Sequence, residues 1–228
     1  MLGSLSFGHG VTHLFDQGFP LFLTDIAATM GLGGFQKAML FGIRQGGSAM
    51  VNLGGGPAVD MLKPQWGAIL TGCMLGAAIS FAAMGASPNL WVLAIAVTLF
   101  AIPGSLWHLP SAAAISQRFP DRRGFAISLH GLGANLGNIL GPIMTGGLLA
   151  ILMWRNVFFL YAIPSLLVGV YIWWSLKDLG KYGEDIEHKD LGYQFREAFQ
   201  LLNDPIILSL TLSAILRGIG LNAMFNWT

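Results

Sequence analysis

Six long apolar stretches follow one another along the chain, and each is long enough to cross a lipid bilayer as a helix. They cover about residues 3–26, 36–59, 66–86, 89–117, 124–152 and 155–176, and a seventh begins near Pro205 and continues to Thr228. The hydrocarbon core of a bilayer is about 30 Å thick and is spanned by roughly 20 mostly apolar helical residues. Short links with turn residues, such as Gly31-Leu-Gly-Gly34, join the first six stretches. The pattern predicts an all-α integral membrane protein.

A longer polar stretch separates the sixth apolar run from the seventh and divides the chain into three parts. We expect a six-helix transmembrane bundle over 1–176, a cytoplasmic central loop over 177–204 and the start of a seventh helix over 205–228. Within the loop, the segment from Tyr193 to Leu202 is predicted to form an amphipathic helix on the membrane surface.

The seventh apolar stretch runs to the last residue of the sequence. An unfinished helix cannot cross a bilayer with its backbone satisfied, so we expect the natural chain to continue and to supply a second half. Gly10-Val-Thr-His-Leu-Phe15-Asp16 also resembles Gly220-Leu-Asn-Ala-Met-Phe225-Asn226 in its glycine and phenylalanine spacing. Repeated halves are common in transporters, so this echo hints that the seventh helix restarts the pattern of the first.

The composition agrees with lipid as the main solvent. Apolar residues make up 54% of the chain and charged residues 10%, whereas a soluble domain carries about 25% charged residues. A net charge of +1 without a basic stripe argues against a nucleic-acid partner. The single Cys73 lies in an apolar run and suggests neither a disulfide framework nor a metal site. We therefore expect no metal and no cofactor.

Basic residues are distributed unequally between the two sets of links, which predicts the orientation of the chain. The links on the side of the N-terminus hold eight basic residues and the opposite links hold Lys37 and Arg155. The eight are Lys63, Arg118, Arg122, Arg123, Lys177, Lys181, Lys189 and Arg196. Because cytoplasmic loops carry the excess of Lys and Arg, we expect a cytoplasmic N-terminus.

Polar and ionisable residues inside the apolar stretches are the candidates for function. Such groups cost roughly 2.5–3.5 kcal/mol each even on lenient insertion scales, so they persist where a partner or a wet cavity receives them. They gather in the first, fourth and seventh stretches, as His9, His13, Asp16, Gln17, Trp107, His108, Arg217, Asn222 and Asn226. The third and sixth stretches hold no ionisable residue. This distribution suggests a transport pathway between the first, fourth and seventh helices.

The first stretch places three titratable groups on one helical face, because His9, His13 and Asp16 are spaced i, i+4 and i+7. With the expected spans, Asp16 lies near the midplane and the histidines lie toward the cytoplasm. A carboxylate above a set of imidazoles could pass protons between a cavity and the cytoplasm. The alternative is that the histidines only hydrogen-bond neighbouring helices and never change charge.

Two arginines lie inside predicted spans, Arg44 in the second and Arg217 in the seventh. Either could pair with Asp16, and either could bind an anionic solute, because a guanidinium matches carboxylate and phosphate geometry. Two arginines against one aspartate leave an excess positive charge, which favours a substrate with an anionic group. The alternative for Arg44 is a structural pair or an outward-reaching side chain.

Three local motifs resemble those of the major facilitator superfamily. They are Gly56-Pro-Ala-Val-Asp60 at the inner end of the second stretch, Gly137-Asn-Ile-Leu-Gly141-Pro142 in the fifth, and Trp154-Arg155-Asn-Val-Phe158 at the start of the sixth. Two further segments are similar to the fosmidomycin-resistance-like branch of that family. These are Trp107-His-Leu-Pro-Ser111 and the run from Arg122 and Arg123 through Asn135 to Gly137.

This resemblance implies the N-terminal half of a 12-helix fold whose first, fourth and seventh helices line a central cavity. It implies that Asp60, with Arg122 and Arg123, belongs to an inner gate, and that Gly56 and Asn135 belong to family motifs. Gly137, Gly141 and Pro142 would let the fifth helix bend and pack closely. The chain departs from the family at Phe100, where many proton-coupled members have an arginine four residues before the glycine that is Gly104 here.

The function that these patterns favour is secondary transport of a small organic solute by alternating access, as a proton-coupled antiporter for efflux. The alternatives are an uptake carrier for an organic anion and a solute-sensing receptor with a transporter fold. A nucleotide-binding Gly-x-x-x-x-Gly-Lys-Ser/Thr loop is absent from the sequence, as are the HExxH, GxSxG and CxxC motifs of enzymes. We expect no enzyme activity, a monomer, and a place in the plasma (inner) membrane of a bacterium.

Overall fold

The computed structural model describes residues 1–181, 191–201 and 203–226, and at positions 191, 194, 198, 214 and 217–226 it describes the backbone alone. The chain forms two compact units, Met1–Glu184 and Asp185–Thr228. All regular secondary structure in the described ranges is helical. The expected all-α class is therefore confirmed.

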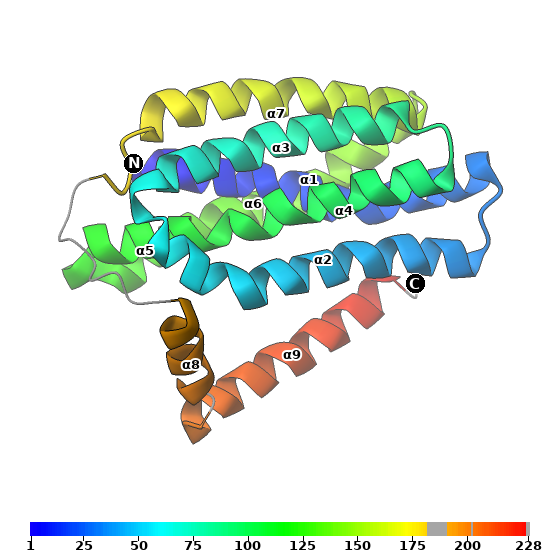
Figure 1. Ribbon diagram of the computed structural model, residues 1–228. Coiled ribbons are helices and arrows are strands. Elements are labelled where there is room, and N and C mark those ends of the chain that lie inside the picture. The colour runs from blue at the N-terminus through cyan, green and yellow to red at the C-terminus, as the bar shows by residue number, and fades with distance from the viewer. Residues whose placement is uncertain (182–190, 202, 227–228) are drawn as a thin grey trace. The chain divides into compact units, whose positions relative to one another are not determined.

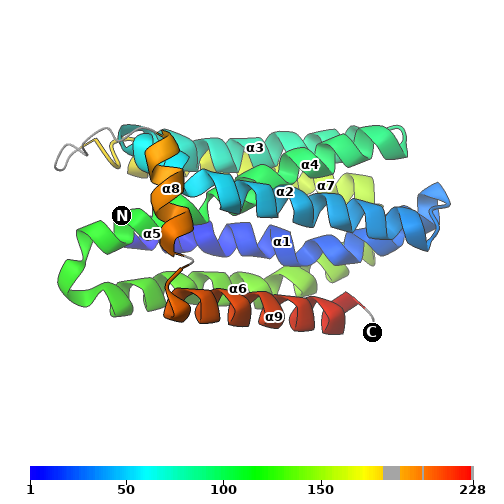
Figure 2. The ribbon, with the colours of Figure 1, turned by 60° about the horizontal axis from the view of Figure 1, so that its bottom comes forward.

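The first unit is a bundle of long helices that lie side by side (Figures 1 and 2). Its helices are α1 (Leu2–Met30), α2 (Gly34–Met61), α3 (Trp66–Ala86), α4 (Leu90–Leu106), α5 (His108–Arg118), α6 (Arg123–Leu149) and α7 (Trp154–Leu176). Two 3-10 turns, η1 (Lys63–Gln65) and η2 (Pro120–Arg122), precede α3 and α6. Figure 1 places the N-terminus, η1 and η2 at one end of the bundle and the links 31–33, 87–89 and 150–153 at the other.

The predicted turns end the helices by ordinary capping chemistry. Gly31 terminates α1 in the left-handed conformation, with φ 66°, where a residue without Cβ meets no steric penalty. The Asn89 side chain accepts hydrogen bonds from the backbone N–H groups of Trp91 and Val92 and so caps α4. These two caps fix the lengths of α1 and α4 within the bundle.

The stretch predicted as one helix over 89–117 is interrupted at Trp107, between α4 and α5. Pro103 and Pro110 flank the interruption, and a proline inside a helix removes a backbone donor and crowds the preceding turn. The Ser111 hydroxyl donates to the carbonyl of Trp107 at 2.7 Å, which satisfies an acceptor at the break. The two helices still count as one apolar span by length and composition.

Three stretches of the described chain are long and apolar enough to cross a membrane by length and composition, namely Lys63–Ala86, Leu90–Arg118 and Trp154–Leu176. The helices α1, α2 and α6 are as long, at 29, 28 and 27 residues, but they contain most of the glycines of the first unit and most of the charged and histidine residues that lie within its α-helices. All six expected spans correspond to helices, with 89–117 divided between α4 and α5. Three of the six also have the length and the mean hydropathy of a membrane-crossing helix.

The bundle has an aromatic interior and an apolar exterior. Phe15, Phe22, Phe81, Phe158 and Tyr161 pack together in one core cluster, with ring centroids 4.0 Å apart for Phe22 and Phe158. Large apolar side chains are also exposed along α7, including Ile163, Leu167, Val170 and Trp174. A surface of this kind on several neighbouring helices is typical of a protein solvated by lipid.

Glycines bring α1 and α6 into direct backbone contact. A Cβ at Gly133 would collide with the carbonyl oxygen of Ser6, and one at Gly141 with the carbonyl oxygen of Leu14. Between them, a Cβ at Gly137 would collide with the Gly10 carbonyl and with Cβ of His13. Small residues at four-residue spacing permit this close approach in membrane helices. The contact sets the register between the two helices that carry most of the site described below.

The second unit contains α8 (Leu191–Leu201) and α9 (Pro205–Asn226). The Asp204 carboxylate accepts a hydrogen bond from the backbone N–H of Ile206 at 2.8 Å and caps α9. The surface helix expected from Tyr193 to Leu202 corresponds to α8, and Leu202 itself lies outside the described residues. The start of the expected seventh helix, Pro205, is the first residue of α9.

Candidate functional site

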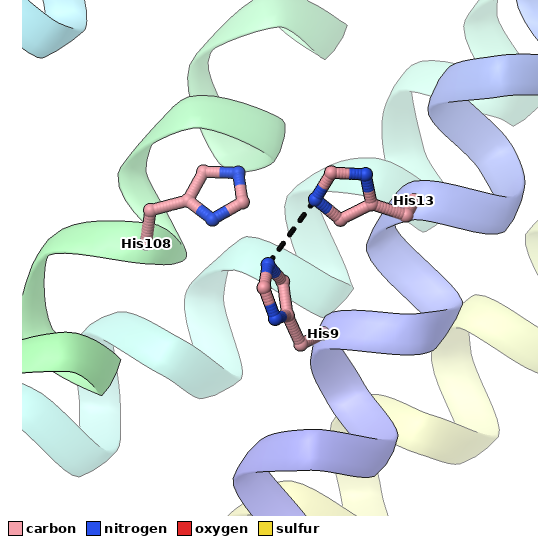
Figure 3. A group of neighbouring side chains, drawn as sticks. All are labelled: His9, His13 and His108. Carbon is pink, nitrogen blue, oxygen red and sulfur yellow. Dashed lines mark hydrogen bonds between the residues drawn. The ribbon is translucent and has the colours of Figure 1, made fainter. Parts of the chain in front are cut away.

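Four histidines meet inside the first unit, from three different helices. His9 and His13 lie one turn apart on α1, His108 begins α5, and His130 lies on α6. The Nε2 atoms of His9 and His13 are 3.1 Å apart. His9 and His130 are buried, and His13 and His108 are half-buried. Figure 3 shows the rings of His9, His13 and His108 turned toward one another.

The Nδ1 atoms of His9 and His13 are hydrogen-bonded to residues of α6. Nδ1 of His9 lies 3.1 Å from the carbonyl oxygen of His130, and Nδ1 of His13 lies 2.9 Å from Oδ1 of Asn138. A carbonyl oxygen can only accept, so each of these Nδ1 atoms carries the proton and donates it. In neutral imidazoles this leaves both Nε2 atoms as bare acceptors.

Two acceptor lone pairs facing each other at 3.1 Å repel unless a positive charge lies between them. A shared proton, with one ring as imidazolium, satisfies this requirement, and so does a metal ion. The arrangement can therefore hold a cation between the two rings of α1, which α6 orients.

Trp107 fixes the position of His108. Its side chain is fully buried, and a Cβ at Gly8 would collide with the Trp107 ring. The break between α4 and α5 is therefore packed against α1, one residue before His108. The ring centroid of His108 lies 4.9 Å from that of His9 and 5.4 Å from that of His13.

His130 and Asn138 were not among the candidates expected from the sequence. The His130 ring stacks on His9 with centroids 4.1 Å apart and planes 13° apart. The signal was present, because His130 is an ionisable residue inside a predicted span and Asn138 follows it by about two helical turns. The criterion applied to the first and fourth stretches would have selected the fifth as well.

Asp16 forms an ion pair with Arg44, from α2. The Arg44 side chain is 5% exposed and that of Asp16 is 37% exposed. The guanidinium carbon of Arg44 lies 4.9 Å from the ring centroid of Phe19 and 5.8 Å from that of Phe100. The pair thus joins α1 to α2, three residues along α1 from His13. Gly104 borders it, since a Cβ there would lie 3.7 Å from the Asp16 carboxylate.

The remaining candidates are scattered. Gln17, Asn135 and Pro142 are exposed, Gly56 is half-buried, and Gly137 and Gly141 are buried against α1. Asp60 and Arg122 are exposed at the ends of α2 and η2, and neither has an ion-pair partner among the described residues. The Nε of Arg123 donates to the carbonyl of Ser116 at 3.2 Å. Arg217, Asn222 and Asn226 lie on α9, and their side chains are outside the described residues.

The fold is similar to that of a transporter of known structure. One of nine matching chains is described as a bacterial homolog to the human lysosomal transporter Spinster, in an inward-facing and unoccupied conformation. The two share 18% sequence identity with a TM-score of 0.65, over 89% of this chain and 48% of that one. The present chain thus spans about half the length of that structure.

No curated protein matches the sequence in a search of characterised proteins. The family model described as Major Facilitator Superfamily matches residues 5–228, which is nearly the whole sequence. Together with the helical bundle and its apolar exterior, the match identifies an integral membrane protein. The chain belongs to the major facilitator superfamily.

Proposed function

We propose that the chain is part of a secondary active transporter that exports a small organic solute in exchange for protons. In this proposal the N-terminus is cytoplasmic, the membrane is a bacterial inner membrane, and the protein belongs to the fosmidomycin-resistance-like branch. Membership of a transporter family supports transport rather than enzyme activity. The observation that carries the proton-coupled mechanism is the ion pair of Asp16 and Arg44 inside the bundle.

The pair provides a switch that responds to one proton. Asp16 neutralises Arg44 while its carboxylate is ionised, and protonation of Asp16 removes that negative charge. The guanidinium of Arg44 is flanked by the aromatic rings of Phe19 and Phe100 and the side chain of Gln45. An exchanger binds the solute and the proton in turn, so the solute binds while Asp16 is ionised, donating a hydrogen bond to this carboxylate while Arg44 contacts its anionic group. Proton uptake by Asp16 removes that acceptor and releases the solute.

The position of Arg44 also bears on the departure at Phe100. Many proton-coupled relatives have an arginine at that position of the fourth helix, where this chain has an aromatic ring. The guanidinium of Arg44 lies over this ring, 5.8 Å from its centroid. A cation from α2 therefore reaches the region that the missing arginine would serve. This supports an anion-binding and proton-coupling role for Arg44 in its place.

The decisive experiment compares Asp16→Asn with the unchanged protein in membrane vesicles. Fosmidomycin, a phosphonate anion, is the probe, because the sequence resembles that branch. We expect a pH gradient to drive its accumulation in inside-out vesicles of the unchanged protein. In Asp16→Asn the gradient should no longer drive accumulation, whereas counterflow of labelled probe should persist, since the amide cannot release a proton.

The matched control is Asp121→Asn, which removes an exposed carboxylate at the end of the bundle. This variant should accumulate the probe as the unchanged protein does. Gradient-driven accumulation that survives in Asp16→Asn would overturn the coupling mechanism. Saturable binding without counterflow in the unchanged protein would instead indicate a solute sensor, and accumulation only in right-side-out vesicles would indicate uptake.

A further inference from the structure

His9, His13 and His108 present their ring nitrogens to one point between α1 and α5. One nitrogen from each ring lies within 4.8 Å of the others. The three residues come from two helices whose relative position is fixed by Trp107 against Gly8. In Figure 3 the three side chains point toward a common centre.

The geometry of the α1 histidines is close to that of two ligands on one metal ion. A zinc–nitrogen bond is about 2.0–2.1 Å long, so two imidazole nitrogens on one tetrahedral ion lie about 3.3 Å apart. The Nε2 atoms of His9 and His13 are 3.1 Å apart. One ring nitrogen of His108 lies within 4.8 Å of these two atoms, so His108 completes a set of three possible ligands.

The hydrogen bonds made by the Nδ1 atoms of His9 and His13 are a second, independent indication of a metal site. Histidines that ligate metals almost always donate their other ring N–H to a carbonyl, carboxylate or water, which fixes the tautomer and aims the free nitrogen. His9 donates from Nδ1 to the His130 carbonyl, and His13 donates from Nδ1 to Asn138. Both rings are therefore oriented with their ligating nitrogens toward the shared centre.

We propose that His9, His13 and His108 bind one divalent transition-metal ion, for which Zn²⁺ is the best match. Imidazole nitrogens suit zinc, copper and nickel, whereas Mg²⁺ and Ca²⁺ take oxygen ligands. Three imidazoles leave a fourth tetrahedral position open. Because three neutral rings leave both positive charges of the ion uncompensated, that position favours an anionic group or hydroxide. Asp16 does not supply it, since its carboxylate is paired with Arg44.

This site goes beyond the transport mechanism proposed above and does not depend on it. The metal would be held by the histidines whether or not Asp16 couples transport to protons. Conversely, the Asp16 and Arg44 switch needs no metal. Binding is therefore measured without any transport assay, so that failure of one proposal leaves the other intact.

The test is a titration of the purified, metal-free protein in lipid nanodiscs with Zn²⁺ against a chromophoric chelator. We expect one Zn²⁺ per chain in the unchanged protein. His13→Gln and His108→Gln should each weaken binding at least about tenfold, because each removes a ligand. Asn138→Ala should weaken it by about 10–100-fold, the usual effect of losing a hydrogen bond behind a ligating histidine.

Two control variants separate the site from general surface binding. His188→Gln removes the one other histidine of the chain that is outside the four-histidine group, and Asn156→Ala removes an exposed asparagine on α7. Both should retain the affinity of the unchanged protein. Absorption of bound Co²⁺ gives a second readout, since intense visible bands report tetrahedral coordination and should be lost in His13→Gln.

The absence of stoichiometric Zn²⁺ binding would overturn the proposal. Unchanged affinity in both His13→Gln and His108→Gln would overturn it as well, because the ion would then reside elsewhere. Circular dichroism of each variant shows whether the helical bundle is intact, and Asn138→Ala tests the site without removing any ligand.

Discussion

The two partners of the Asp16 and Arg44 pair differ in their contact with solvent, and this difference makes them unequal in energy. Arg44 is 5% exposed and Asp16 is 37% exposed. A charge that loses its partner pays a desolvation penalty that grows with its burial. Removing the aspartate therefore leaves the more deeply buried charge alone, whereas removing the arginine leaves a charge that water can still reach.

We predict that Asp16→Asn destabilises the protein more than Arg44→Gln does. Breaking a fully buried pair costs about 3–5 kcal/mol, and the partial exposure of Asp16 reduces the expected cost for Asp16→Asn to about 1–3 kcal/mol. Thermal unfolding in detergent, followed by circular dichroism, measures the order of the two variants. The double variant should recover part of the loss, because no charge then remains unpaired. Equal losses that simply add would contradict a direct pair.

Arg44 also distinguishes anionic from neutral solutes at the residue scale. We predict that Arg44→Gln slows transport of an anionic probe such as fosmidomycin by about tenfold or more, since one charge-assisted contact contributes about 1.5–3 kcal/mol. A neutral solute of similar size should be affected less. Transport rates of both solutes in the same vesicles provide the comparison. Equal loss for the two would indicate a structural role for Arg44.

The sequence was sufficient to select most of these residues but not their pairing. Histidine and aspartate inside apolar stretches stand out because their insertion is costly. Which arginine meets Asp16 depends on the packing of α2 against α1, and periodicity along one helix carries no information about it. His130 was missed although its ionisable side chain lies inside a predicted span, whereas its second contribution, the backbone carbonyl that accepts from Nδ1 of His9, has no signature in the sequence.

At the scale of helices, the glycines of α6 determine how closely the site is assembled. Gly133, Gly137 and Gly141 face the backbone of α1, whereas Gly131 on the same helix has open space where a Cβ would be. Small residues were expected to allow close packing. The identity of the partner helix and the resulting alignment of His13 with Asn138 emerged only from the structure.

We predict opposite effects for Gly137→Ala and Gly131→Ala. The new Cβ at position 137 would collide with the Gly10 carbonyl and force the helices apart, and overpacking of this kind typically costs about 1–3 kcal/mol. At position 131 the same change fills open space and gains helix propensity of up to about 1 kcal/mol. Thermal unfolding of the two variants tests this contrast. A stable Gly137→Ala would mean that α1 and α6 are not in backbone contact.

The interruption between α4 and α5 was the main element that the sequence pattern did not predict. The apolar pattern runs through Trp107 without a gap, so the sequence predicted a single helix there. The break depends on the buried Trp107 ring, which packs against Gly8 of another helix. Long-range packing of this kind has no signature in the local sequence.

For the whole molecule, the alternation of the links predicts which residues face each side of the membrane. Lys37 lies in the first turn of α2 and Asp121 in η2, at opposite ends of the bundle. In a protein with Cys73 replaced by alanine, we predict that a membrane-impermeant maleimide labels Lys37→Cys in intact cells. Asp121→Cys should be labelled only after the cells are permeabilised. The reverse pattern would place the N-terminus outside.

The backbone contact between α1 and α6 restricts how this bundle can change shape. Where two main chains touch without intervening side chains, neither helix can slide or roll without a clash, so the pair moves as one body. This pair of helices carries four residues of the site, His9, His13, His130 and Asn138. Trp107 packs the start of α5 against Gly8 of α1, so a change of shape within this bundle is expressed first in the displacement of α2, which brings Arg44 to the site. Arg44 is thus the part of the site that can move relative to His9 and His13, while the arrangement of the histidines stays constant.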